Sequence, residues 1–415
     1  MEAPFLTPAN VQPLAFDVGL RLEEIDQSKL NSERLTKIQR ELARHDYAGC
    51  LLADPINIRY ATGSRNQFGW TIHAPGRWAF ISTAGPVVLF EFLSSKHLND
   101  GLKTIDEIRG STPWFFQVAG GRADEKADSW AKDIAAVVRE YGGSNNRLAV
   151  DRCEPRGADR LRSHGIKLFD AQEALERARS IKTVEEIQAL RLATDVCDVG
   201  CERMKAALQP GITENQLWAV FHDVNIAHNG EWIESRFLCS GERTNPWYQE
   251  CSDRVIQAGD LVAFDSDMIG PLGYMSDISR TWICPGKTPT AEQRELYEIS
   301  QEQLLTNIEL LKPGLSAREF AEAAWPLPER FVPNRYMAMV HGVGMVGEYP
   351  QIPFGCDFAE LGYEATFEEN MVVSVESYIG ERGRKEGVKL EQQVLITSRG
   401  AEILSKTPLV DALEL

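Results

Sequence analysis

The sequence predicts a two-domain protein of mixed α and β structure: an α/β domain followed by an α+β domain with a mostly antiparallel sheet. At 415 residues, the chain exceeds the length of a typical single core, so two domains are expected. Short apolar strands alternate with amphipathic helices over residues 1–178, whereas runs of strands and runs of helices are interleaved over residues 179–415. We predict these two ranges as the domains.

The composition is that of an ordinary soluble globular protein, and its charge restricts the partners. The net charge of −17 and the pI near 5 argue against nucleic acid and against an anionic membrane surface. The first twenty residues lack a basic segment followed by an apolar core, and no run approaches the ~18 apolar residues of a membrane span. The eight cysteines are scattered, without a CxxC pair. We therefore expect a cytoplasmic protein with reduced cysteines that binds neither nucleic acid nor a membrane.

The first domain is expected to begin with an arm, residues 1–30, packed on the surface or on a partner subunit. A helix with Ser32 as its N-cap should follow. The aromatic stretch Asn66–Trp78 is either a lid over a cleft or an intersubunit contact. A long charged helix, Ala174–Ala207, should lead into the second domain. The other expected elements of this domain are strands at Ala48–Leu52, Trp78–Ser82, Pro86–Phe92 and Arg147–Val150 and a helix at Ala123–Tyr141.

The second domain should interleave helices with β-strands, several of them rich in Val and Ile. The expected helices are Glu214–Ala227, Thr290–Leu311 and Ala317–Ala324. The expected strands are Trp232–Cys239, Leu261–Asp267, Ser276–Ile283, Met371–Tyr378 and Val388–Thr397.

The stretch Leu261–Trp282 contains a cluster of acids. Asp265 and Asp267 follow an apolar run and should face the same way, because side chains two apart on a strand share a face. A Gly/Pro-rich turn then folds Asp277 back beside them, as in a hairpin. Three carboxylates brought together repel one another unless a cation lies between them. The alternative is a solvated acidic edge.

Three residues further along the chain favour the cation. His341 begins the Gly-rich segment HGVGMVGEYP, and Glu376 and Glu391 are isolated acids in Val-rich strands. A buried carboxylate needs a partner, so these strands suggest a shared site. Five carboxylates and one imidazole suit Mn, Fe, Co or Zn. If all five are ionised, two divalent ions balance them better than one.

This order and spacing resemble the creatinase/methionine aminopeptidase, or pita-bread, superfamily, which includes prolidases and aminopeptidase P. The resemblance implies a creatinase-like α/β N-terminal domain before a pita-bread metal-binding domain. It also implies a homodimer in which one N-terminal domain completes the partner's site. The implied metal ligands are Asp265, Asp277, His341, Glu376 and Glu391. In the family the second Asp usually follows the first by eleven positions, whereas Asp277 follows Asp265 by twelve, and Asp267 is an additional acid.

Two positions depart from the peptidases of this superfamily. Those enzymes use two His residues that bind no metal to handle substrate and protons. In SGERTNPWYQE, Trp247 stands where one of them would be, and HGVGMVGEYP offers Gly347 and Glu348 in place of the other. These changes disfavour peptide hydrolysis, while the retained ligands disfavour a metal-free protein.

The segments ADPINIRYAT, GEWIESRFLCSGERTNPWYQECSDR and FDSD…SDISR resemble the DddP type of dimethylsulfoniopropionate lyase, a pita-bread enzyme that cleaves a C–S bond. This resemblance implies that Asp267 is an iron ligand and that Tyr336 lies on the substrate side. It also implies a catalytic base six positions after the ligand His, where this chain has Gly347, and a substrate-side Trp near Val332–Pro333 that is replaced. One or two metal ions are expected, iron first, with Mn, Zn or Co as alternatives.

The reaction that the resemblance implies is β-elimination, which needs another base in this chain. The candidates are Glu348, Asp267, Tyr336 or a hydroxide on the metal, although Glu348 is also expected to shape the site. Trp70, Trp247 and Tyr248 could line a wall for a sulfonium or quaternary ammonium group. The alternatives are a metallohydrolase of the Xaa-Pro peptidase or C–N hydrolase kind, and a non-catalytic binding protein on the same scaffold.

Overall fold

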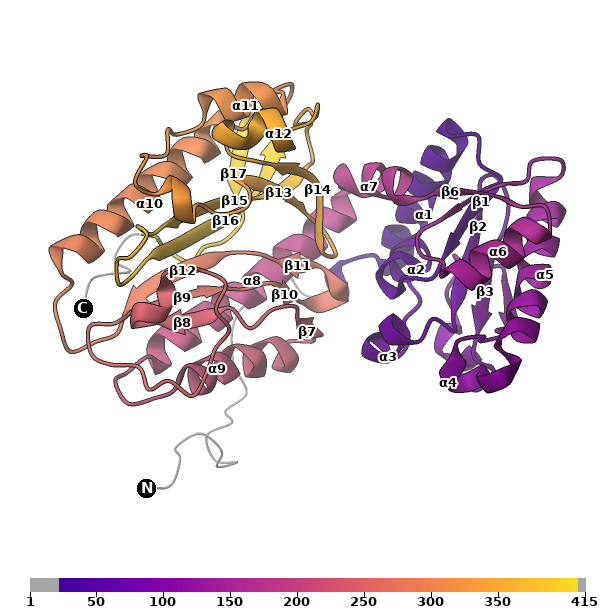
Figure 1. Cartoon of the computed structure of the whole chain (residues 1–415), viewed down its shortest axis with the longest axis horizontal. Helices are drawn as coiled ribbons and strands as arrows, with labels where there is room; N and C mark the ends of the chain where they lie inside the picture. The colour runs from indigo at the N-terminus through magenta and orange to yellow at the C-terminus, as the bar shows by residue number, and fades with distance from the viewer. Residues whose placement is uncertain (1–21, 410–415) are drawn as a thin grey trace.

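In the computed structural model, which describes residues 22–409, helices α7 (Gln172–Ser180) and α8 (Val184–Ala207) connect two domains (Figure 1). The expectation of one continuous helix from Ala174 is wrong. The chain breaks because the Thr183 side chain and Glu186 form a capping box that starts α8. The division of the domains between residues 178 and 179 stays a prediction.

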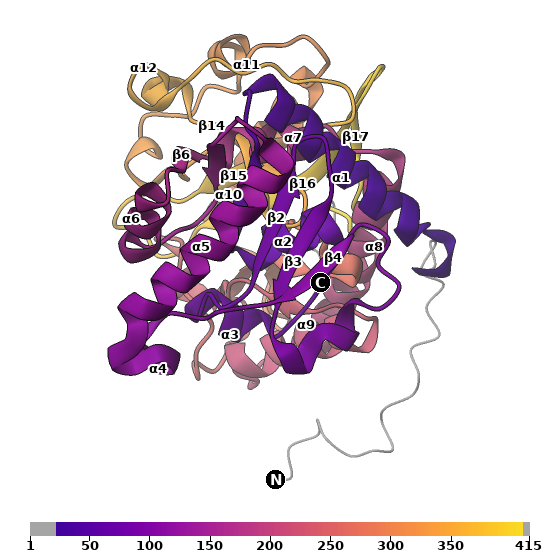
Figure 2. The same ribbon diagram turned by 90° about the vertical axis from the view of Figure 1, so that its right-hand side faces the viewer.

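The N-terminal domain is built on a six-stranded sheet in the order β4-β3-β2-β1-β5-β6, with β1–β2 and β2–β3 antiparallel and the other pairs parallel. Helices α1 and α5 pack on opposite faces of this sheet, because alternate residues of β1 and β2 belong to two different hydrophobic clusters (Figure 2). The strands are β1 Gly49–Leu52, β2 Trp78–Ser82, β3 Val87–Glu91, β4 Glu107–Gly110, β5 Arg147–Val150 and β6 Lys167–Asp170. The helices are α1 Gln27–Arg44, α2 Pro55–Thr62, α3 Phe68–His73, α4 Phe116–Ala119, α5 Ala123–Gly142 and α6 Pro155–Ser163.

Two expectations for this domain need correction. Helix α1 begins at Gln27 rather than after Ser32, because the Asp26 side chain accepts a hydrogen bond from the Lys29 N–H and caps it. The expected arm overlaps α1 at its end, and its first 21 residues lie outside the described part of the chain. The aromatic stretch after α2 is not only a loop, since it contains α3.

The C-terminal domain carries one five-stranded sheet, β14-β13-β15-β16-β17, and two three-stranded sheets, β12-β9-β8 and β11-β10-β7. Every pairing between these strands is antiparallel, as predicted. Helices α10 and α11 lie on one side of the strands, and α8 and α9 lie on the other (Figure 1). The strands are β7 Trp232–Ile233, β8 Leu238–Ser240, β9 Leu261–Asp265, β10 Met268–Ile269, β11 Met275–Ser276, β12 Ser279–Ile283, β13 Val340–Val343, β14 Gly347–Ile352, β15 Val372–Ile379, β16 Val388–Thr397 and β17 Gly400–Ile403. The helices are α9 Glu214–Ala227, α10 Ala291–Leu310, α11 Ala317–Ala323 and α12 Phe358–Leu361.

A buried ion pair joins the two domains. Lys37 of α1 contacts Glu186 of α8, with 2.6 Å between Nζ and Oε2, and both side chains are buried. The hydroxyl of Tyr274, which follows β10, donates to the same carboxylate at 3.3 Å. The N-terminal domain therefore neutralises a buried charge of the C-terminal domain.

The structure also bears on the expected reduced cysteines and on membrane-spanning helices. None of the eight cysteines, all within the described range, forms a disulfide. Between residues 22 and 409, no helix combines the length and the apolar character that a membrane crossing requires.

Candidate metal centre

The acidic hairpin places its three Asp residues together. Strands β9 and β12 pair so that Asp265 lies opposite Ser279, and beyond them Met268 of β10 pairs with Ser276 of β11. Asp267 interrupts the expected strand because it adopts a φ of 36°, a left-handed conformation that a non-glycine residue rarely takes. Carboxylate oxygens of Asp265, Asp267 and Asp277 lie within 4.8 Å of one another.

The other three predicted ligands approach this cluster from the five-stranded sheet. Glu376 of β15 lies directly opposite Glu391 of β16 in the antiparallel ladder, so both carboxylates stand on one face. Nε2 of His341, on β13, lies 3.4 Å from Glu376, 3.6 Å from Asp277 and 3.7 Å from Glu391. The structure therefore brings all six predicted residues to one place.

A lysine that the sequence reasoning missed lies among these carboxylates. The Nζ atom of Lys389 is 2.6 Å from Glu376, 3.0 Å from Glu391 and 3.2 Å from Asp265. Its side chain is fully buried and also donates to the Ser279 hydroxyl at 2.7 Å. The signal was present, because a residue two positions before Glu391 must share its strand face.

The cluster is strongly coupled electrostatically. Burial, and then Glu391, raises the pKa of Asp265 and of Asp277 well above the usual value. Burial tends to lower the pKa of His341, but its interactions with the neighbouring carboxylates of Glu376 and Glu391 raise it well above that of a free histidine. Burial would raise the pKa of Glu391, but Lys389 and then His341 lower it. Without a metal, the cluster therefore holds protons that ions would displace.

The residues fit a metal. Three buried oxygens, Oδ1 of Asp265, Oδ1 of Asp277 and Oε1 of Glu391, have no hydrogen-bond partner in the described part of the chain. Buried carboxylate oxygens without donors are costly, and a cation satisfies them. With Lys389 as one positive charge against five ionised carboxylates, four negative charges remain. Two divalent ions would neutralise them.

An aromatic pair stands over the lysine. The ring of Tyr336 lies 4.7 Å from Lys389 Nζ and stacks on Tyr248, with 5.3 Å between the ring centroids. Tyr248 is 46% exposed, so this pair faces solvent. Trp247, by contrast, is buried against Tyr378.

The structure does not place Trp70 in this group. Its ring packs on Phe92 and Phe115 within the N-terminal domain. Of the three predicted wall residues, Tyr248 stacks on Tyr336, and the ring centre of Trp247 lies 5.9 Å from Lys389 Nζ, so these two lie near the cluster in a single chain. The substrate roles of all three predicted residues stay predictions.

Gly347 and Glu348, although adjacent in the chain, have different surroundings. Glu348 is buried, accepts from Lys182 Nζ at 2.8 Å and accepts from the Met345 N–H at 3.1 Å. These contacts engage both oxygens that a base would use, and the expected role of Glu348 in shaping the site stays a prediction. Gly347 is exposed, and a Cβ built on it would meet only His341 Nδ1, at 3.9 Å. The position of the missing acid is therefore open space beside His341.

Glu234 is a second acid that the sequence reasoning missed. Its backbone N–H donates to the Asp267 carbonyl at 3.0 Å. Burial of the carboxyl group, and then the charge of Asp267, raise the pKa of Glu234 to about 7. It lies in the segment GEWIESR, where no pattern distinguished it from an ordinary surface acid.

Comparison with known proteins accounts for this arrangement. The model of metallopeptidase family M24 matches residues 188–398, and that of the creatinase/prolidase N-terminal domain matches residues 34–181. The chain belongs to metallopeptidase family M24. It is 35% identical over 400 residues to a dimethylsulfoniopropionate lyase DddP of Roseovarius nubinhibens, covering 95% of this chain and 89% of that protein.

Two Xaa-Pro dipeptidases are also similar to this chain, at lower identity. A Xaa-Pro dipeptidase of Pyrococcus furiosus is 31% identical over 243 residues, 57% of this chain and 66% of that protein. The structure of a Xaa-Pro dipeptidase from Bacillus anthracis superposes with a TM-score of 0.73 at 21% identity, covering 91% of this chain and 98% of that one, which shows a shared fold. The predicted pita-bread architecture is confirmed. Since these relatives are lyases and dipeptidases, this M24 protein is a metal-dependent enzyme, and the non-catalytic alternative is set aside.

Proposed function

We propose that this M24 protein is a metal-dependent lyase of the DddP type, which cleaves a C–S bond in dimethylsulfoniopropionate or a similar small charged substrate. The observation that carries the proposal is the third acid of the hairpin. Asp267 lies with Asp265 and Asp277 within 4.8 Å, and its left-handed backbone makes room for the extra residue. The similarity to a lyase across 95% of the chain supports the same branch.

The reaction removes a proton from the carbon next to the substrate carboxylate. That electron pair forms a C=C bond, the C–S bond breaks, and the sulfide leaves with the C–S electrons. A metal held by the six proposed ligands would supply Lewis acidity that acidifies this C–H bond. Burial and then Glu376 raise the pKa of Tyr336 well above its usual value, so its hydroxyl stays a hydrogen-bond donor. The exposed face of the Tyr248–Tyr336 pair suits a sulfonium group.

Position 347 provides the decisive experiment. Gly347 has ordinary backbone angles, since it is absent from the positive-φ glycines, and a Cβ there meets no clash. Gly347→Asp therefore restores an acid beside His341, and Gly347→Asn is its matched uncharged control. A positioned general base contributes about 10²–10⁴-fold.

We expect the metal-loaded Gly347→Asp variant to release dimethyl sulfide and acrylate from dimethylsulfoniopropionate at least about 10-fold faster than wild type. The Gly347→Asn variant should show no gain. If neither the wild type nor Gly347→Asp releases dimethyl sulfide when fully metallated, this substrate is excluded.

A Xaa-Pro dipeptidase is the second candidate, because the fold and five of the six acidic and imidazole positions are those implied by the peptidase resemblance. Trp247 is buried where a substrate-handling His would be expected, which counts against it. Turnover of Xaa-Pro dipeptides that is lost in Glu376→Gln would favour this candidate over the lyase.

We further propose iron as the metal and a homodimer as the active form. Support for the dimer is the exposure of four large apolar side chains of the N-terminal domain, Trp70, Leu93, Phe116 and Val118. Light scattering should give twice the chain mass, and Phe116→Asp should shift it toward the monomer. Elemental analysis after native purification should find iron, and another metal in its place would overturn that assignment.

A further inference from the structure

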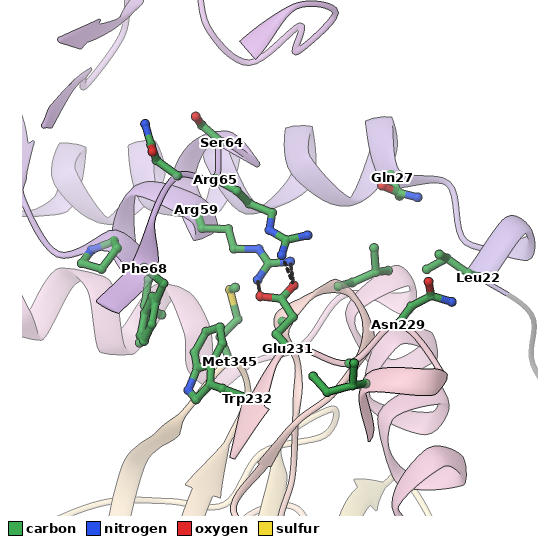
Figure 3. Close-up of a pocket in the computed structure, with 17 residues that line it drawn as sticks. Leu22, Gln27, Arg59, Ser64, Arg65, Phe68, Asn229, Glu231, Trp232 and Met345 are labelled. Atoms are coloured by element: carbon green, nitrogen blue, oxygen red, sulfur yellow. Dashed lines mark hydrogen bonds and ion pairs between the residues drawn. The ribbon is translucent and has the colours of Figure 1, made fainter. Parts of the chain in front are cut away.

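A cavity of about 710 Å³ lies between the two domains, separate from the proposed metal ligands (Figure 3). Its upper wall comes from α2, α3 and the segment that joins them in the N-terminal domain. Its lower wall comes from the segment after α9, from β7 and from the turn of the acidic hairpin. The volume falls in the range of small-molecule sites.

One side of the cavity carries two cationic side chains and one anionic side chain. Arg59 binds Glu231 with two parallel hydrogen bonds of 2.7 and 2.6 Å, so both carboxylate oxygens are already engaged. Arg65 reaches the same carboxylate at 3.1 Å, but its side chain is 61% exposed. Figure 3 shows both guanidinium groups directed at this one Glu. Two cations therefore share one anion, and Arg65 keeps donors for another partner.

The other side of the cavity is apolar. Phe68 of α3 stacks on Trp232 of β7, with 3.9 Å between the ring centroids and 20° between the planes. Leu272 and Met345 extend this wall. The stack joins residues of two domains, so an occupant here touches both.

We propose that this cavity binds an amphipathic ligand with a single negative charge, its carboxylate or sulfonate on Arg65 and its flat apolar body on Trp232 and Phe68. The ligand carries one charge because, among the described residues that line the cavity, only one cation is unbalanced, and the chain's net charge of −17 repels polyanions. The guanidinium fork matches a planar anion.

This site has a direct connection to the acidic hairpin. Trp232 pairs with Ile269 of β10, two residues after Asp267, and Arg59 packs against Gly273 in the hairpin turn. An occupant would therefore hold the hairpin against the N-terminal domain. The inference goes beyond the proposed lyase reaction and does not depend on it.

The test is a fluorescence titration of the metal-loaded full chain with anilinonaphthalene sulfonate, an anionic flat probe, and with N-phenylnaphthylamine, its neutral counterpart. Arg65→Ala should weaken binding of the anionic probe by about 10-fold or more, since it removes a charge-assisted hydrogen bond. The neutral probe should bind this variant within about 2-fold of wild type.

Arg122→Ala is the matched control, because Arg122 is an exposed arginine of the same domain, paired with Glu125 and outside the cavity. It should bind both probes like wild type. Saturable anionic-probe binding that Arg65→Ala selectively weakens supports the site. No saturable binding, unchanged binding in Arg65→Ala, or equal loss of both probes overturns it. Turnover is not measured, so these outcomes leave the lyase proposal to its own test.

Discussion

Replacing Lys389 with Met should strongly destabilise the metal-free protein. The Lys389 ammonium is fully buried and contacts three carboxylates at 2.6–3.2 Å, and Met fills a similar volume without the charge. Removing one partner of a buried ion pair costs about 3–5 kcal/mol. We expect a loss of that size in the free energy of unfolding, because Asp265, Glu376 and Glu391 then lose the cation that contacts all three of them.

Urea denaturation of the metal-free wild type and variant measures this loss. The loss should be larger at pH 8 than at pH 5, because at low pH the freed carboxylates can take up protons. Lys389→Arg retains the charge and should keep most of the stability, and added divalent metal should recover part of the loss in Lys389→Met. A loss below about 1 kcal/mol, within the range of an exposed ion pair, would refute the role given to this lysine.

Three further predictions follow from the same contacts. Metal binding should release protons into a weakly buffered solution, and the affinity for metal should rise with pH, because the pKa values of Asp265 and Asp277 are raised. A metal titration without proton release would contradict this prediction. Glu376→Gln should lower the affinity for metal by at least about 10-fold, so that elemental analysis after dialysis finds less bound metal than in the wild type. Full retention of the metal would show that Glu376 is not a ligand. Burial raises the pKa of Asp151 from 3.8 to about 6, so between these pH values the folded protein binds a proton that the unfolded protein releases. This residue therefore lowers the free energy of unfolding by up to about 3 kcal/mol as the pH rises from 4 to 6. Asp151→Asn should flatten that part of the stability–pH profile, and an unchanged slope would refute the prediction.

Much of the fold could be predicted because its strong elements are locally encoded. The strands at Trp78–Ser82, Arg147–Val150 and Val388–Thr397 and the helix Glu214–Ala227 have the predicted bounds. The expected strand Trp232–Cys239 is wrong, because the structure divides it into β7 and β8. Two other errors came where a side chain overrides the apolar pattern. Thr183 caps a helix inside a segment that is helical on both sides, and Asp26 caps α1 before its apolar periodicity begins.

The acids and the histidine of the site could be predicted from the sequence. The buried lysine that partly neutralises them could not. Isolated acids in Val-rich strands pointed to a shared cation, and the structure brings all of them together. Lys389 was overlooked because a lysine beside a strand acid usually reaches solvent, and only the pairing of β15 with β16 shows that it cannot. Likewise, the contact between Glu348 and Lys182 joins residues that are 166 positions apart, which no local pattern records.

The buried pair of Lys37 and Glu186 bears on modularity. Family relationships invite the idea that the metal-binding half could be expressed or recombined by itself. Cutting the chain ahead of α8 would remove Lys37 and leave Glu186, together with the Tyr274 hydroxyl that donates to it, at a newly wetted surface beside the acidic hairpin. The first domain thus supplies, through Lys37, the counter-ion of a buried carboxylate in the second domain. A stable excised C-terminal domain would need Glu186 replaced by an uncharged residue.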